Sequence, residues 1–100
     1  MTIRHIVSWR LAADDAQERD AQAAEVARRL VALDGQVPGM LAITAGANTV
    51  LPGSNWDVAL VADFDSVEAL DGYQKHPAHL EAAGYIRSVA ADRVAVDFGL

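Results

Sequence analysis

The chain has 100 residues, with 52% hydrophobic and 22% charged side chains, a net charge of −6 and no cysteine. This length and composition predict one folded domain over residues 1–100, and they exclude a disordered polymer, disulfides and thiolate metal sites. The acidic balance disfavours nucleic acid and anionic membranes as partners, and because neither a signal peptide nor a spanning apolar run is visible, we expect a cytoplasmic protein.

The first two predicted elements are a strand and a helix. Side chains of residues 3–11 alternate between two faces, as in a strand, and one face is apolar except for His5. From residue 14 to 34 the apolar period becomes helical, with a cap at Asp14 or Asp15. Glu18 lies three residues after Asp15, as a capping box requires.

Two further strands are predicted over residues 40–47 and 56–64, with a turn-rich loop between them. The earlier of the two is apolar on both faces, which is typical of a strand covered on both sides. In the later one, alternation places Trp56 and Val58 on the same face, and Trp56 is expected to pack in the core or to wall a pocket.

A helix, a break and another helix follow. Asp65 and Ser66 provide a helix start, while His76 precedes a proline and therefore avoids helical angles. Pro77 suits the first position of a new helix, which His76 would cap. This helix is predicted to run to about residue 90, and residues 92–98 form the last strand. Its expected inner stripe consists of Leu80, Ala83, Ile86 and Val89.

The element order β-α-β-β-α-β predicts a ferredoxin-like α+β fold, with helices on one face of a four-stranded antiparallel sheet. The other face carries apolar side chains, among them Ile6, Ala59 and Val61. We therefore expect two copies to pack sheet against sheet as a homodimer with two-fold symmetry.

Three segments resemble the stress-responsive α/β-barrel family, also called the Dabb family, over essentially the whole chain. They are Ile3-Arg4-His5-Ile6-Val7, Pro38-Gly39 with Gly46-Ala47-Asn48, and Phe64-Asp65-Ser66 leading through Leu70 to Tyr73-Gln74-Lys75-His76-Pro77-Ala78-His79. The resemblance implies a dimeric α+β barrel. One activity in the family is the intramolecular aldol cyclisation of a linear polyketide, by a plant cyclase that needs no metal or organic cofactor.

The three histidines and one tyrosine are the candidates for chemistry. We expect His5, Tyr73 and His79 to meet between the sheet and the helices. An imidazole accepts a proton near neutral pH, and a phenol can donate a hydrogen bond to a carbonyl as it becomes an enolate. The resemblance implies that His79 is the general base, Tyr73 its partner and His5 a pocket residue.

The same resemblance identifies less polar positions in the expected pocket. The family cyclase has a histidine on its third strand where this chain has Val58, and a tyrosine on its first helix where this chain has Leu30. Together with His5 and Trp9, these residues are the expected substrate contacts. Fewer polar side chains are therefore expected around the proton-transfer residues than in the cyclase.

Structural roles for the same residues remain open alternatives. His5 and Tyr73 could be core residues with satisfied polar atoms, and His79 could bond locally. His76 and His79 with His5 could hold a metal, but this spacing is weak evidence, so we expect neither metal nor cofactor. The main hypothesis is a homodimer that binds a small, largely apolar molecule, with possible cofactor-free acid–base chemistry. The alternatives are a non-catalytic stress or structural protein and a cofactor-free monooxygenase.

Overall fold

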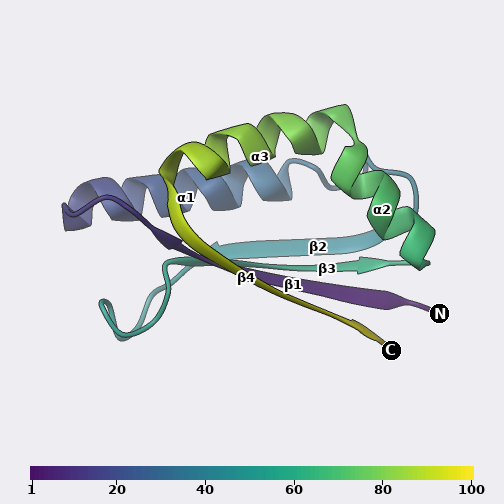
Figure 1. Cartoon of the computed structure of the whole chain (residues 1–100), viewed down its shortest axis with the longest axis horizontal. Helices are drawn as coiled ribbons and strands as arrows, with labels where there is room; N and C mark the ends of the chain where they lie inside the picture. Colours follow the sequence, from purple (N-terminus) through teal and green to yellow (C-terminus); the bar gives the residue numbers. More distant parts are fainter.

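The computed structural model describes residues 1–100 and has a ferredoxin-like α+β fold (Figure 1). Four strands form one antiparallel sheet in the order β2-β3-β1-β4, and the three helices cover one of its faces. The predicted element order is therefore confirmed. The elements are β1 (Ile3–Leu11), α1 (Ala16–Val31), β2 (Met40–Ala47), β3 (Val58–Phe64), α2 (Val67–Lys75), α3 (Pro77–Val89) and β4 (Ala90–Gly99).

The hydrophobic core lies between the sheet and the helices. Alternate residues of β1 are buried there, from Ile3 to Leu11, and His5 is the only buried polar residue of the chain. Phe64 and Tyr73 are among the largest fully buried side chains, and their ring centroids lie 5.0 Å apart. None of the three helices has the length and apolarity that crossing a membrane requires.

Local capping determines where each helix begins. The Asp15 carboxylate accepts a hydrogen bond from the Glu18 amide at 2.9 Å, so Asp15 rather than Asp14 caps α1. Ser66 caps α2, and His76 Nδ1 accepts from the Ala78 amide at 3.1 Å and caps α3. The break at His76 and the restart at Pro77 are thus confirmed.

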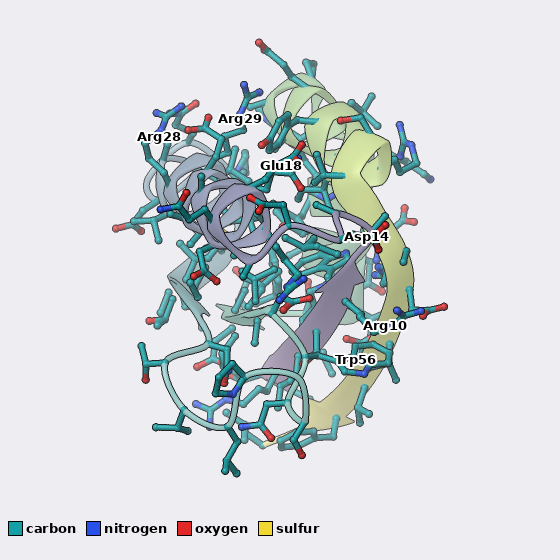
Figure 2. All side chains as sticks on the ribbon, turned by 90° about the vertical axis from the view of Figure 1, so that its left-hand side faces the viewer. Arg10, Asp14, Glu18, Arg28, Arg29 and Trp56 are labelled. Carbon is teal, nitrogen blue, oxygen red and sulfur yellow. The ribbon has the colours of Figure 1, made fainter.

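Several predicted boundaries and faces were wrong. Helix α1 ends at Val31 rather than at residue 34, because a series of turns follows it. Strand β3 begins at Val58, so Trp56 lies on the preceding loop, 37% exposed and outside the core (Figure 2). Strand β4 begins at Ala90, two residues before the predicted start.

The inner stripe of α3 also differs from the prediction. Leu80 is 51% exposed, whereas Ala82 and Ile86 are buried. Each residue turns a helix by about 100°, which places Leu80 about 120° around the helix from Ile86. The same arithmetic places His79 within about 20° of Ile86, on the face that packs toward the sheet.

One glycine permits the close approach of α2 to the chain before β2. Gly39 has a φ of +79°, and a Cβ atom built on it would lie 2.6 Å from the Cβ atom of Ala69. The Asp65 amide donates to the Gly39 carbonyl at 2.9 Å. Both the backbone angle and the contact therefore require glycine here.

The sheet face opposite the helices is apolar and uncovered in the single chain. Strand register places Ile6 of β1 between Val61 of β3 and Val96 of β4. Val61 and Val96 are exposed, as are Val94 and Phe98 on the same face of β4. This row of exposed side chains is unusual for a chain without a partner.

Candidate functional site

A cavity of about 300 Å³ lies between the sheet and the helices. Five of the six predicted site residues border it, from four different elements. Val58 is the exception, because this first residue of β3 is buried in the core and does not reach the cavity. The full wall consists of His5, Val7, Trp9, Leu30, Leu60, Tyr73, Gln74, His79, Ala83, Ile86, Arg87 and Arg93.

The strand and the helix break bring three chemically capable side chains together. His5 extends from the helix-facing side of β1, Tyr73 from the last turns of α2, and His79 from the first turn of α3. The ring centroids of Tyr73 and His79 are 4.3 Å apart, and those of His5 and Tyr73 are 6.2 Å apart. Tyr73 therefore packs against both imidazoles.

Asp97 belongs to this group, and sequence reasoning missed it. It lies opposite His5 in the β1–β4 register, and its carboxylate forms a hydrogen bond with His5 Nδ1. Since a carboxylate accepts, Nδ1 carries the proton of this hydrogen bond. The alternation of Arg93, Ala95 and Asp97 on β4 could have indicated this side, but only once the strand pairing was known.

Two polar atoms of the site have no partner within the protein. Only three buried side-chain nitrogen or oxygen atoms in the chain lack a hydrogen bond, and two of them are Tyr73 Oη and His79 Nδ1. Buried polar groups normally find partners, so a pair of unsatisfied atoms beside a cavity is typical of a site that a ligand completes.

Burial and nearby charge set the protonation of these two groups. Burial raises the pKa of Tyr73 to about 12, opposed by the charge of Arg93, so the phenol keeps its proton. Burial also lowers the pKa of His79 below 6.5. The positive charges of His5, Arg93 and Arg87 lower this pKa further, whereas the backbone of Gln74 raises it through a hydrogen bond. His79 is therefore a neutral imidazole at pH 7 and can accept a proton.

The histidines do not assemble a metal site. No group of three or more histidine, aspartate or glutamate side chains lies in a position to hold a metal ion. His76 uses its Nδ1 atom as the cap of α3 and contributes nothing to the cavity wall. Imidazole and phenol side chains such as those of His5, Tyr73 and His79 can exchange protons and hydrogen bonds with a bound molecule.

Comparison with known proteins identifies the family. The model of the Stress Responsive A/B Barrel Domain, Dabb, matches residues 3–100. The chain belongs to the Dabb family. Among curated protein sequences, none matches this Dabb chain at a significant level.

Solved structures share the fold over nearly the whole Dabb chain. A dimeric ferredoxin-like protein of unknown function from Thermobifida fusca is 36% identical, with a TM-score of 0.85 and coverage of 100% of this chain and 92% of its own. A dimeric protein of ferredoxin-like fold from Bacteroides fragilis is 26% identical, with a TM-score of 0.89 and coverage of 99% and 96%. A cofactor-independent oxygenase from Streptomyces nogalater, 14% identical with a TM-score of 0.74 and coverage of 99% and 92%, shares the fold alone.

Proposed function

We propose that this Dabb protein is a single-domain, cytoplasmic homodimer that binds a small, largely apolar molecule in the cavity and transfers protons without a cofactor. The chemistry resembles that of a polyketide cyclase, with His79 as the general base and Tyr73 as the hydrogen-bond donor. The observation that carries this proposal is the cavity of about 300 Å³ beside two unsatisfied polar atoms, Tyr73 Oη and His79 Nδ1.

The proposed reaction begins next to a ligand carbonyl. Neutral His79 removes a proton from the adjacent carbon, and the electron pair of that C–H bond moves toward the carbonyl to form an enolate. The Tyr73 phenol, which keeps its proton, donates a hydrogen bond to the enolate oxygen. Attack of the enolate carbon on a second carbonyl forms a C–C bond, and the new alkoxide takes the proton back from the His79 imidazolium.

His5 has a positioning role in this proposal. Its Nδ1–H donates to Asp97, which fixes the orientation of the ring on β1. A polar group of the ligand would form a hydrogen bond with the other ring nitrogen, Nε2. Trp9 and Leu30, both buried in the cavity wall, would contact the apolar part of the ligand.

The homodimer would form through the apolar sheet face, away from the cavity. Val61, Val94, Val96 and Phe98 are exposed on that face, and burying them against a second copy removes apolar area from water. The description of the Thermobifida fusca and Bacteroides fragilis relatives as dimeric supports this assembly.

Hydrogen exchange of a ketone tests the chemistry without knowledge of the natural substrate. In D2O, the protein should accelerate loss of the α-proton NMR signals of 2-heptanone, an apolar methyl ketone. His79→Ala should slow this exchange by about 10²–10⁴-fold, as expected for removal of a general base. Leu80→Ala, on the exposed side of the same helix turn, is the matched control and should leave the rate unchanged.

Two results would favour the alternative functions. If 2-heptanone shifts the amide signals of the cavity residues but wild type exchanges no faster than His79→Ala, the cavity binds without catalysis. If the protein consumes O2 with an enolisable substrate, the monooxygenase hypothesis replaces the cyclase-like one.

A further inference from the structure

The positive side chains of this acidic chain fall into two groups. The chain has eight lysine and arginine residues, and six of them form ion pairs with carboxylates. The other two, Arg87 and Arg93, have no carboxylate partner, and both line the cavity. Figure 2 shows two of the paired residues, Arg28 and Arg29, on α1. The six paired residues are Arg4, Arg10, Arg19, Arg28, Arg29 and Lys75.

The cavity wall has no negative charge to balance these two arginines. None of its twelve residues is aspartate or glutamate. Asp97, which lies opposite His5 in the β1–β4 register, is not part of the wall and already bonds to His5. In a chain with a net charge of −6, the cavity is therefore locally positive.

The charged and apolar parts of the cavity are separated in space. Arg87 near the end of α3 and Arg93 on β4 are exposed, so they mark the mouth of the cavity. Deeper wall residues, such as Leu30, Leu60 and Ile86, are buried and apolar. The cavity thus matches a molecule with an apolar body and one anionic end.

We infer that the ligand of this cavity is an apolar carboxylate, whose carboxylate group binds Arg87 and Arg93 at the mouth while its apolar body contacts the inner wall. This inference rests on the proposed function, because it names the substrate class of the same cavity. Guanidinium groups suit it, since their planar donors match carboxylate geometry. For the proposed chemistry, the substrate would be a keto acid whose carbonyl lies beside His79 and Tyr73.

A matched pair of probes tests this inference. Octanoate and octanamide differ mainly in charge, and isothermal titration calorimetry measures the affinity of the Dabb protein for each. Octanoate should bind at least about tenfold more tightly, which reflects charge-assisted bonds to two arginines. Raising the salt concentration should weaken octanoate binding and leave octanamide binding unchanged.

Variants assign the effect to the two arginines. The double variant R87Q/R93Q should bind octanoate and octanamide equally, while R10Q, at a paired and exposed arginine, should keep the preference. Because Arg87 and Arg93 are exposed and unpaired, the double variant should fold normally, as circular dichroism can verify.

The outcomes separate this inference from the proposed function. If octanamide binds as tightly as octanoate in the wild-type protein, or if R87Q/R93Q retains the preference, the carboxylate inference is overturned while ligand binding in the cavity stands. If neither probe binds or shifts the amide signals of the cavity residues, both the inference and the proposed binding function are overturned.

Discussion

Replacement of Tyr73 by phenylalanine separates the stability of the fold from its chemistry. The Tyr73 hydroxyl is buried without a hydrogen-bond partner, and such a group costs about 1–3 kcal/mol of desolvation free energy. A phenylalanine ring keeps the packing against Phe64 and His79, whose ring centroids lie 5.0 and 4.3 Å away. Tyr73→Phe should therefore raise the free energy of unfolding by about 1 kcal/mol, equivalent to about 4–8 °C in Tm for a domain of this size.

Urea denaturation followed by tryptophan fluorescence measures this change, at one fixed protein concentration because a dimer's stability depends on concentration. Tyr85→Phe is the matched control. The Tyr85 ring lies under the Arg29 guanidinium at 4.3 Å. Unlike the Tyr73 hydroxyl, the Tyr85 hydroxyl is not among the buried polar atoms that lack a hydrogen bond. Its stability should change by less than about 0.5 kcal/mol. If Tyr73→Phe lowers the free energy of unfolding by more than about 0.5 kcal/mol, the Tyr73 hydroxyl forms a hydrogen bond in the folded state and the reasoning fails.

The same variant should lose activity as it gains stability. Removal of one hydrogen-bond donor to an enolate oxygen lowers a rate by about 10²–10³-fold, so exchange of 2-heptanone should fall by that factor in Tyr73→Phe. Opposite effects on stability and rate are expected where a polar group is retained for function. An unchanged exchange rate would show that Tyr73 donates no bond to the enolate.

Three further predictions concern the turn before β2, the sheet face and the proposed base. Gly39→Ala should lower the free energy of unfolding by about 1–2 kcal/mol for its positive φ, plus a further loss from the close contact with α2. Gly35→Ala, at φ +78° in open space, should lose only the part due to φ. Equal losses of stability in urea denaturation would contradict the effect of the contact. In sedimentation velocity, Val96→Lys should convert the dimer, of twice 10.6 kDa, into a monomer of 10.6 kDa. Val67→Lys, at an exposed position on α2, should remain dimeric. A monomeric wild-type protein would refute the proposed interface. The NMR titration midpoint of His79 should lie below pH 6.5. The histidine then binds a proton more readily in the unfolded chain than in the folded protein, so the free energy of unfolding should fall as the pH drops below 6.5. This fall should be smaller in His79→Ala. A midpoint at or above 6.5 would contradict burial as the dominant effect.

The parts of the fold with local determinants could be predicted from the sequence. The alternation of β1, the Asp15 cap and the break before Pro77 depend on residues a few positions apart, and each was found in the structure. Predictions that needed the tertiary arrangement were less successful. Trp56 follows the alternation of β3, but the strand pairing ends before it and leaves it exposed on a loop.

The site shows the same division. Residue type and spacing were enough to select His5, Tyr73 and His79, which meet at the cavity. Asp97 could not be selected, because it pairs with His5 across 92 positions of sequence through the β1–β4 register. Nor does any sequence pattern reveal which polar atoms remain without partners, since that depends on the packing of every neighbour. Val58 was selected only by alignment with the family cyclase, and it is a buried core residue that does not border the cavity.

The break at His76 explains why this site exists at all. In one continuous helix, Tyr73 and His79 would be separated by six residues, about 9 Å along the axis and about 120° around it, so their rings could not touch. His76 instead adopts extended angles, φ −65° and ψ 135°, and Pro77 begins a new helix in a new direction. The two rings then lie 4.3 Å apart beside the cavity. The residues that stop and restart the helix therefore bring together the proposed base and the proposed hydrogen-bond donor, although neither His76 nor Pro77 borders the cavity.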